Sequence, residues 1–183
     1  MTSDVPGNEM PGPLAGLRVL ELTGEQAQFC GKLMADLGAD VIKIEPLGGQ
    51  ETRNVGPFLD DQPGPERSLH FWHYNTSKRG VTLDITKPEG QEVFRKLAST
   101  AGLVLESFPV GYLPGLGLGY ESLAADNPGL IMCSVSPFGQ DGPWRDYKTS
   151  DLLHLAAGGQ MASSGYDVED VPDAPPIAPG GGN

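Results

Sequence analysis

The sequence predicts an α/β fold, a Rossmann-like parallel sheet flanked by helices. Three observations support this prediction. Residues 16–49 read as strand, helix and strand. Short apolar runs then alternate with helix-like periodicity as far as residue 135, which is typical of α/β proteins. Finally, a helical crossover between two strands makes them parallel, and such crossovers are right-handed in nearly all known cases.

The opening segment justifies the first three elements. Residues 18–22 and 41–45 are short apolar runs suited to buried strands. Between them, four residues spaced i, i+3, i+4 and i+7 predict the core-facing side of a helix: Cys30, Leu33, Met34 and Leu37. Gly38 follows where a helix is expected to stop. Ligands of open α/β sheets bind beyond the carboxyl ends of the strands, so residues 23–27 and 45–49 are the first candidates for a site.

The later elements continue the alternation. Thr86 and Glu89 have the spacing of a capping box, and Ser150 is placed to cap a final helix. Residues 48–68, rich in Gly, Pro, Asp and Gln, predict an irregular excursion. Strands are expected at residues 80–83, 103–106 and 130–135, and helices at residues 88–101, 120–125 and 150–157.

The domain organisation follows from composition along the chain. Residues 13–165 are expected to form one domain. Residues 1–12 read as a disordered lead-in without the basic and apolar regions of a signal peptide. Residues 166–183 are rich in Pro, Gly and Asp and are expected to form a tail or the start of a linker. The ending at Asn183 suggests a fragment or one piece of a split enzyme.

The charge and cysteine content narrow the class of protein. A formal net charge of −12 disfavours a nucleic-acid or anionic-membrane partner, since both require a basic surface. No run approaches the roughly 20 apolar residues of a membrane span. Cys30 and Cys133 are expected to be free buried thiols rather than a disulfide. Together these features predict a cytoplasmic protein.

Several motifs suggest a nucleotide-like ligand, each with a plainer alternative. Residues 23–27 open a helix, whose free N–H groups suit a phosphate, but the G-x-G-x-x-G fingerprint is absent. Glu45 imitates the ribose-binding acid of dinucleotide folds, although without those glycines an NAD site is disfavoured against a purely structural unit. Lys78 and Arg79 are a basic pair that would meet a phosphate or a carboxylate, or simply form a solvated turn. Residues 136–142 are a glycine-rich loop that would approach a ligand or serve only as a connection.

The histidines offer one acid–base candidate and no metal site. His70, His73 and His154 lack metal-ligand spacing, so no metal is expected. His70 and His73 lie among aromatic residues, where packing or hydrogen bonding is the simpler role. Asp151 and His154 are three residues apart and would share one helix face, which makes them a candidate pair by residue type. The alternative is that Asp151 only compensates the helix dipole.

Taken together, six segments resemble the family III CoA-transferases, the group that includes formyl-CoA transferase, carnitine CoA-transferase and the α-methylacyl-CoA racemases. The resemblance covers nearly all of residues 13–165, and the segments are PLAGLRVLELT, LMADLGADVIKIEPLGG, NTSKRGVTLDITKPEG, LVLESF, GLGLGYESLAADNPGLIMCSVSPFGQDGPW and SDLLHLAAGGQMASSG. It implies the incomplete large domain of an interlocked-dimer fold. Coenzyme A would be the co-substrate, with an acyl-CoA and a carboxylic acid as substrates. A homo- or hetero-oligomeric chain would supply the missing half.

The resemblance also implies roles for particular residues. Asp151 would be a supporting acid near the nucleophilic aspartate, which the family places in a Gly-Asp pair that does not occur before Asn183. Pro46 stands where the family often has a basic residue, which weakens the expected hold on phosphate. The positions carried over for coenzyme A are Gln26, Ala27, Leu83, Phe108 and Lys148.

Three activities remain open on this basis. The first is a CoA-transferase, or one subunit of such an enzyme, working through an aspartyl intermediate. The second is a non-catalytic acyl-CoA-binding subunit that requires a partner chain. The third is an acyl-CoA racemase. It is disfavoured because Ser150 occupies the position of the racemase histidine.

Overall fold

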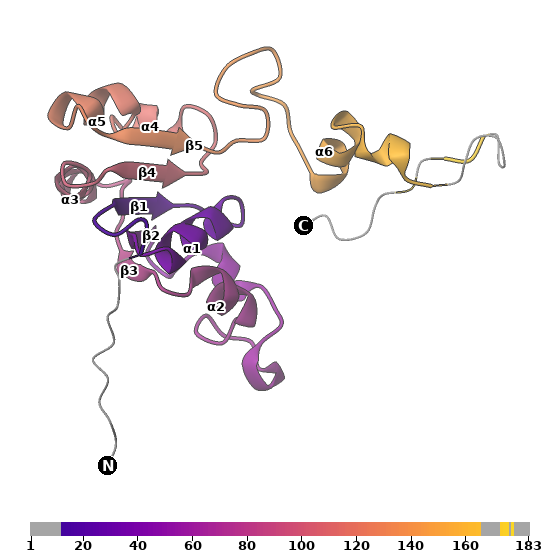
Figure 1. Cartoon of the computed structure of the whole chain (residues 1–183), viewed down its shortest axis with the longest axis horizontal. Helices are drawn as coiled ribbons and strands as arrows, with labels where there is room; N and C mark the ends of the chain where they lie inside the picture. The colour runs from indigo at the N-terminus through magenta and orange to yellow at the C-terminus, as the bar shows by residue number, and fades with distance from the viewer. Residues whose placement is uncertain (1–11, 166–172, 176, 178–183) are drawn as a thin grey trace. The chain divides into compact units, whose positions relative to one another are not determined.

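The computed structural model describes residues 12–165, 173–175 and 177. Its centre is a sheet of five parallel strands in the order β3-β2-β1-β4-β5 (Figure 1). The prediction of a Rossmann-like parallel sheet is therefore confirmed. The strands are β1 (Arg18–Leu22), β2 (Asp40–Glu45), β3 (Arg79–Thr82), β4 (Leu103–Glu106) and β5 (Ile131–Ser134). The predictions for residues 1–11 and for most of 166–183 lie outside the described residues.

Six α-helices are described. Four correspond to expected helices within a few residues, whereas the second and fourth were not predicted. Three 3-10 turns accompany them, at Glu51–Asn54, Leu59–Asp61 and Gln160–Ser163. The α-helices are α1 (Gln28–Asp36), α2 (Leu69–Asn75), α3 (Pro88–Ala98), α4 (Tyr112–Gly115), α5 (Tyr120–Asp126) and α6 (Asp151–Ala157).

The two predicted helix caps had different outcomes. The Ser150 hydroxyl accepts from the Leu153 amide at the start of α6, as expected. The capping box at Thr86 and Glu89 was wrong. The Asp84 carboxylate instead accepts from both the amide and the hydroxyl of Thr86, and the N-cap of α3 is Lys87, directly before Pro88. The turn before α3 is thus held by Asp84, the second residue after β3.

The chain divides into two units, Met1–Ser136 and Pro137–Asn183, and each is described here by itself. The first contains the whole sheet and helices α1 to α5. The second contains α6 and the last 3-10 turn. The sequence predicted one domain over residues 13–165 and no boundary between Ser136 and Pro137.

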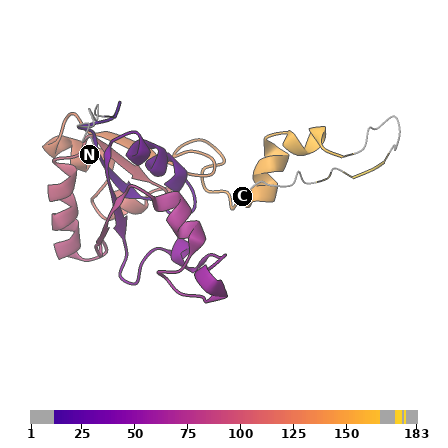
Figure 2. The same cartoon turned by 60° about the horizontal axis from the view of Figure 1, so that its bottom comes forward.

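Helices cover both faces of the sheet (Figure 2), and a hydrophobic core lies on each face. Alternation along a strand sends successive side chains to opposite faces. The larger core, beneath α3, α4 and α5, contains Leu20, Leu22, Ile42, Ile44, Phe94, Val104, Leu113 and Leu118. The smaller core, beneath α1, contains Val19, Ala35, Ala39, Val41 and Leu105.

The buried side of α1 differs from the expected one. Cys30, Leu33 and Leu37 are exposed, and small or polar residues face the sheet instead. Gly31 explains the change, because a Cβ placed there would overlap the carboxylate of Glu21 on the strand beneath. The helix therefore turns its smallest residues inward: Gln28, Gly31 and Ala35.

The last strand is covered on one face only. Ile131 is 64% exposed, and Cys133, two residues further on, is also exposed. Met132, on the opposite face, packs against the larger core. Both cysteines are free thiols, as expected, but the prediction that they are buried was wrong. Cys133 lies on the uncovered face, and Cys30 on the outer side of α1.

Candidate active site

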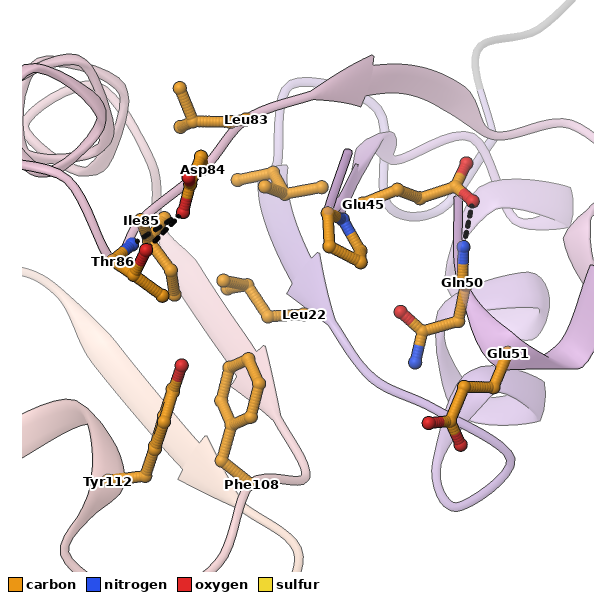
Figure 3. A pocket seen from close by; sticks show the side chains of 12 residues that line it. Leu22, Glu45, Gln50, Glu51, Leu83, Asp84, Ile85, Thr86, Phe108 and Tyr112 are labelled. Carbon is orange, nitrogen blue, oxygen red and sulfur yellow. Dashed lines mark hydrogen bonds between the residues drawn. The ribbon is translucent and has the colours of Figure 1, made fainter. Parts of the chain in front are cut away.

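A pocket of about 200 Å³ lies at the carboxyl ends of the strands, where ligands of open α/β sheets bind (Figure 3). Leu22 and Glu45 close β1 and β2, residues 83–86 follow β3, and Phe108 follows β4. Two sequence candidates for coenzyme A, Leu83 and Phe108, are therefore brought to one pocket. The remaining lining residues are Ile44, Pro46, Gln50, Glu51 and Tyr112.

The pocket has an aromatic wall. The rings of Phe108 and Tyr112 have centroids 4.6 Å apart at an interplanar angle of 32°. The Phe108 amide donates to the Glu106 carboxylate over 2.7 Å, which fixes the backbone at this point. Opposite the rings lie aliphatic side chains, and Asp84 and Glu51 add carboxylates to the lining (Figure 3). A flat, largely apolar group with hydrogen-bond donors on its edge suits this lining, whereas a phosphate does not.

Glu45 serves a structural role at this edge. Arg53 Nε and Nη2 donate to its two carboxylate oxygens over 2.6 and 2.8 Å, and the Gln50 amide donates over 2.9 Å. The guanidinium also lies 3.9 Å from the centroid of the Phe71 ring. Burial raises the pKa of Glu45, but the Arg53 and Gln50 hydrogen bonds outweigh it and the pKa is lowered. With both oxygens engaged, Glu45 is not free to bind a ribose, and its likeness to a dinucleotide-binding acid was misleading.

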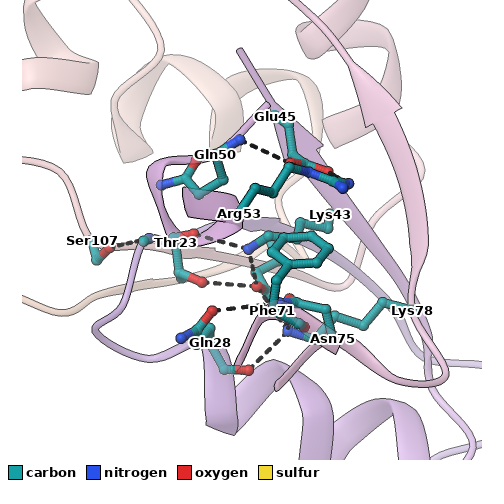
Figure 4. Close-up of polar contacts among 12 residues, drawn as sticks. Thr23, Gln28, Lys43, Glu45, Gln50, Arg53, Phe71, Asn75, Lys78 and Ser107 are labelled. Atoms are coloured by element: carbon teal, nitrogen blue, oxygen red, sulfur yellow. Dashed lines mark hydrogen bonds and ion pairs between the residues drawn. The ribbon is translucent and has the colours of Figure 1, made fainter. Parts of the chain in front are cut away.

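A second polar cluster lies on the α1 face of the same edge (Figure 4). Glu21 is fully buried and accepts from Lys43 Nζ over 2.9 Å, Lys78 Nζ over 3.0 Å and the Thr23 hydroxyl over 2.8 Å. Both lysine side chains are 2% exposed. Lys78 was expected to meet a phosphate or a carboxylate, or to lie in a solvated turn. It is buried and bonds the Glu21 carboxylate, so the interpretation as a solvated turn is wrong.

The cluster continues into α1 and α2. Lys78 Nζ donates to the Gln28 carbonyl over 2.8 Å and to Asn75 Oδ1 over 2.9 Å. The Gln28 side chain meets Asn75 over 3.4 Å and His70 Nε2 over 3.2 Å. His70 also packs on Tyr74 with ring centroids 4.8 Å apart. His70 is thus a packed, hydrogen-bonded residue, the simpler of its two interpretations.

The first loop, Gly24–Ala27, carries the candidates Gln26 and Ala27. Neither lines the pocket, yet the loop adjoins two segments that do. The Gly24 amide donates to the Ser107 hydroxyl over 3.0 Å, next to Phe108. A Cβ on Gly24 would lie 3.2 Å from Gln50 Nε2. Ala27 has φ of 65°, in the left-handed region, where α1 begins.

The remaining candidates belong to the second unit. Asp151 is exposed at the start of α6, and Lys148 is exposed just before it. His154 Nε2 lies 2.7 Å from the Thr149 hydroxyl, and its ring packs edge-on against Phe138 with centroids 5.4 Å apart. The contacts described for His154 are therefore to these two residues and not to Asp151, so the geometry gives no support to an Asp151–His154 pair.

Sequence reasoning missed the buried charges, although a signal was present. Glu21 and Lys43 each interrupt an otherwise apolar strand, and a charge inside a buried strand requires a partner. Tyr112 was missed because the short α4 carries no motif, and Asp84 because the capping-box pattern drew attention to Thr86 instead.

The described part of the chain contains neither a cluster of metal ligands nor a membrane-spanning helix. No group of three or more His, Cys, Asp or Glu side chains comes together there as metal ligands would. None of the helices in that part has the length and apolarity needed to cross a bilayer.

Comparisons with known proteins agree on one family. The model of CoA-transferase family III matches residues 14–182. The succinyl-CoA:(R)-benzylsuccinate CoA-transferase subunit BbsE of Thauera aromatica is 45% identical over 86% of this chain and 38% of its own length. The succinate–glutarate CoA-transferase of Agrobacterium fabrum is 41% identical over 97% of this chain and 44% of its own.

Solved structures show the same relationship. The crystal structure of a CAIB/BAIF family protein from Brucella suis superposes with a TM-score of 0.81 at 39% identity. The match covers 94% of this chain and 45% of that protein. The chain thus spans about two fifths of the length of the curated relatives above, and the similarity covers its sheet and both of its units.

Proposed function

Because the chain belongs to CoA-transferase family III, we propose that it is the coenzyme A-binding part of an enzyme that moves CoA between an acyl-CoA and a carboxylic acid. The pocket at the strand ends carries this proposal. It combines Leu83 and Phe108, both carried over as CoA contacts, with an aromatic wall. Sites for drug-sized ligands usually enclose roughly 300–1,000 Å³, so a pocket of about 200 Å³ takes only one portion of CoA.

We assign that portion to the adenine. A purine has flat apolar faces that stack on Phe108 and Tyr112, and its exocyclic amine is a donor suited to Asp84 or Glu51. The same carboxylates repel phosphates, which would therefore lie outside the pocket. The first loop, with Gln26 and Ala27 at the start of α1, offers backbone N–H groups for them. In the second unit, the exposed Lys148 is the cation proposed to contact a phosphate of CoA.

The proposed chemistry is covalent. An aspartate carboxylate attacks the thioester carbonyl, forms a mixed anhydride and releases the CoA thiolate. The thiolate then attacks the aspartyl carbonyl, releases the acyl group as its carboxylate and leaves an aspartyl-CoA thioester. The acceptor carboxylate finally repeats these two steps in reverse order. No described residue is assigned as this nucleophile. The role proposed for this chain is to bind and orient CoA, with Asp151 as a supporting acid.

The assembly is part of the proposal. The relative BbsE is named as a subunit, which favours an oligomer in which a further segment or a partner chain completes the active site. The same observation supports the second candidate, a non-catalytic acyl-CoA-binding subunit. Cytoplasmic location is proposed with the enzyme role. A racemase remains disfavoured by Ser150.

Calorimetric titration with desulfo-CoA, which lacks the reactive thiol, tests the binding role. Phe108→Ala removes half of the aromatic wall, and base–aromatic stacking is worth about 1–3 kcal/mol per base. We therefore expect its dissociation constant to rise at least about fivefold. Tyr120→Ala, an exposed aromatic on α5 outside the pocket, is the matched control and should bind like the wild type. Equal affinity in all three proteins would contradict the adenine assignment.

Isotope transfer separates an enzyme from a binding subunit. The chain, assembled with whatever completes it, is incubated with unlabelled succinyl-CoA and labelled succinate. Label appearing in succinyl-CoA supports a transferase. Binding of desulfo-CoA without any exchange of label supports the non-catalytic subunit.

A further inference from the structure

We propose that Lys43 and Lys78 are positioning residues for coenzyme A: from one shared carboxylate, Glu21, they hold the two ends of the first loop in the conformation that receives the ligand. This inference rests on the proposed function and deepens it. Lys43 acts at the end where the loop leaves β1, and Lys78 acts where it enters α1 (Figure 4).

Lys43 fixes the first end. Glu21 and Lys43 are register partners in the parallel pair of β1 and β2, so the strands bring them together. Besides its bond to Glu21, Lys43 Nζ donates to the Thr23 carbonyl over 3.0 Å. Thr23 directly precedes Gly24, so this contact sets where the chain leaves the sheet.

Lys78 fixes the second end. Its ammonium has three N–H donors, which bond Glu21 Oε1, the Gln28 carbonyl and Asn75 Oδ1 within 3.0 Å, and Glu21 Oε2 is also 2.8 Å away. Gln28 is the first residue of α1 and directly follows Ala27. Since every donor is used, the geometry around Nζ allows little freedom, and α1 and α2 are joined at the same atom.

The loop needs such support because its own conformation is costly. A non-glycine residue in the left-handed region costs roughly 1–2 kcal/mol, and Ala27 has φ of 65°. Ala27 is also the N-cap of α1 and offers no side-chain hydrogen bond to the helix. Lys78 holds the Gln28 carbonyl directly after Ala27, so it anchors this end of the loop, although as a donor it does not replace the missing acceptor of an N-cap.

The loop in turn adjoins the pocket. Gly24 bonds Ser107, the neighbour of Phe108, and lies against Gln50 in the pocket wall. A displaced loop would therefore shift two segments of the proposed adenine site, besides moving the N–H groups proposed to meet phosphate. Lys43 and Lys78 are buried and neither lines the pocket, so their proposed effect on CoA passes through this loop.

Deprotonation of Lys78 should weaken its hold on the loop, which can be measured. Burial lowers the pKa of Lys78 to about 8, against the raising effect of Glu21. A neutral amine keeps only two N–H donors, so one of the three contacts is lost. The titratable and charged groups around Lys78 are Glu21 from β1, Lys43 from β2, and Cys30, Lys32 and Asp36 from α1. From α2 come the uncharged Asn75 and, bonded to the Gln28 side chain, the titratable His70.

The test measures the affinity of the full chain for desulfo-CoA at pH 7 and pH 9.5, together with amide hydrogen exchange in residues 24–28 corrected for its intrinsic pH dependence. In the wild type we expect affinity to fall severalfold at the higher pH, with faster exchange in this segment. Lys78→Met should be weakened severalfold already at pH 7 and show no further fall. Arg79→Met is the matched control, since this neighbouring cation is exposed and pairs with Asp40 only, and it should follow the wild type.

Each other outcome is decisive. If Lys78→Met binds desulfo-CoA with the same affinity and the same pH dependence as the wild type, the positioning role is overturned. If Lys78→Met does not fold, the wild type alone decides. The positioning role is then overturned if the wild type shows the same affinity and the same exchange rate at both pH values. If the wild type and Arg79→Met bind no desulfo-CoA at either pH, the proposed function fails, and exchange in residues 24–28 separately reports whether Lys78 holds the loop.

Discussion

Glu21 and Lys43 face each other across the parallel pair of β1 and β2, with carboxylate and ammonium 2.9 Å apart and side chains 0% and 2% exposed. Lys78 adds a second ammonium to the same carboxylate. Removing one member of a buried ion pair costs about 3–5 kcal/mol because an uncompensated charge remains. In this trio, however, loss of Lys78 leaves a neutral pair, whereas loss of Glu21 leaves two buried cations. Glu21 is therefore the member whose replacement should be least tolerated.

The stability of the protein should depend on pH through Lys78. The folded state releases this proton near pH 8, whereas the unfolded chain keeps it to the ordinary pKa of 10.5. Between these values the unfolded state binds more protons, so the free energy of unfolding rises with pH, by at most about 1.4 kcal/mol per pH unit. Lys78→Met lacks this term. Urea unfolding from pH 7 to 10 should show the wild type gaining stability relative to the variant above pH 8. A constant difference would contradict the lowered pKa.

Gly31→Ala should be strongly destabilising. Its methyl group would overlap the Glu21 carboxylate and come within 3.3 Å of Lys78 Nζ, so either the ion cluster or α1 must move. Overpacking costs typically about 1–3 kcal/mol, and we expect the upper part of that range in urea unfolding. Gly115→Ala is the matched control, because the space around its Cβ position is open. A loss no larger than that of the control would show that α1 shifts without penalty.

Arg53→Met should destabilise the segment after β2. It removes both hydrogen bonds that Arg53 donates to Glu45, whose side chain is only 7% exposed, and the packing on Phe71. We expect a loss of about 3 kcal/mol, against at most about 0.5 kcal/mol for Lys96→Met, which breaks an exposed helical pair with Glu92. Thermal unfolding of the three proteins measures the difference.

The Arg53 effect should also fade in acid. Since the pKa of folded Glu45 is lowered below its ordinary 4.5, the stabilisation is present above that value and is lost as pH falls through the folded pKa. The wild type and Arg53→Met should therefore converge in stability as pH drops below 4.5 and through the lower pKa of folded Glu45. A gap that stays constant down to acid unfolding would place the stabilisation in the contact with Phe71 instead.

Asp151→Asn tests the supporting acid in the assembled enzyme. The exchange rate of labelled succinate into succinyl-CoA should fall at least tenfold, while the affinity for desulfo-CoA changes less than twofold. Asp146→Asn, an exposed carboxylate of the same unit paired with Arg145, is the control. An equal loss of turnover and affinity would make Asp151 structural.

Apolar patterning predicted the sheet well. All five strands lie within a residue or so of their expected positions. The central strands β1, β2 and β4 are buried on both faces and read as short apolar runs, whereas the exposed β3 and the half-covered β5 were found from their place in the alternation of strands and helices. The same reasoning chose the wrong side of α1. Helical periodicity predicts that Leu33 and Leu37 are buried, but both are exposed. The helix packs closely over the Glu21 carboxylate only where Gly31 faces it. A buried charge on the strand beneath does not change the apolar pattern of the helix, so the sequence pattern could not show this.

The site was predicted only as far as its strand ends. Leu83 and Phe108 were placed in the pocket through family resemblance, whereas Tyr112 depends on the unpredicted α4. The Lys78 contacts join residues up to 57 positions apart. Contacts between residues so far apart in the chain depend on the order of the strands in the sheet. Local sequence patterns do not specify that order. For Glu45, the structural role that the sequence favoured over a dinucleotide site is supported, since Arg53 bonds both carboxylate oxygens.

The uncovered face of β5 has a practical consequence for handling the protein in solution. Ile131 offers an apolar side chain on the strand that ends the described sheet, and exposed apolar strands at a sheet edge favour aggregation. We therefore expect this strand to contribute to self-association of the isolated chain at high concentration. Ile131→Thr keeps a β-branched side chain that suits a strand and removes apolar surface already in contact with water. Solubility can thus be improved here at little expense to the folded state.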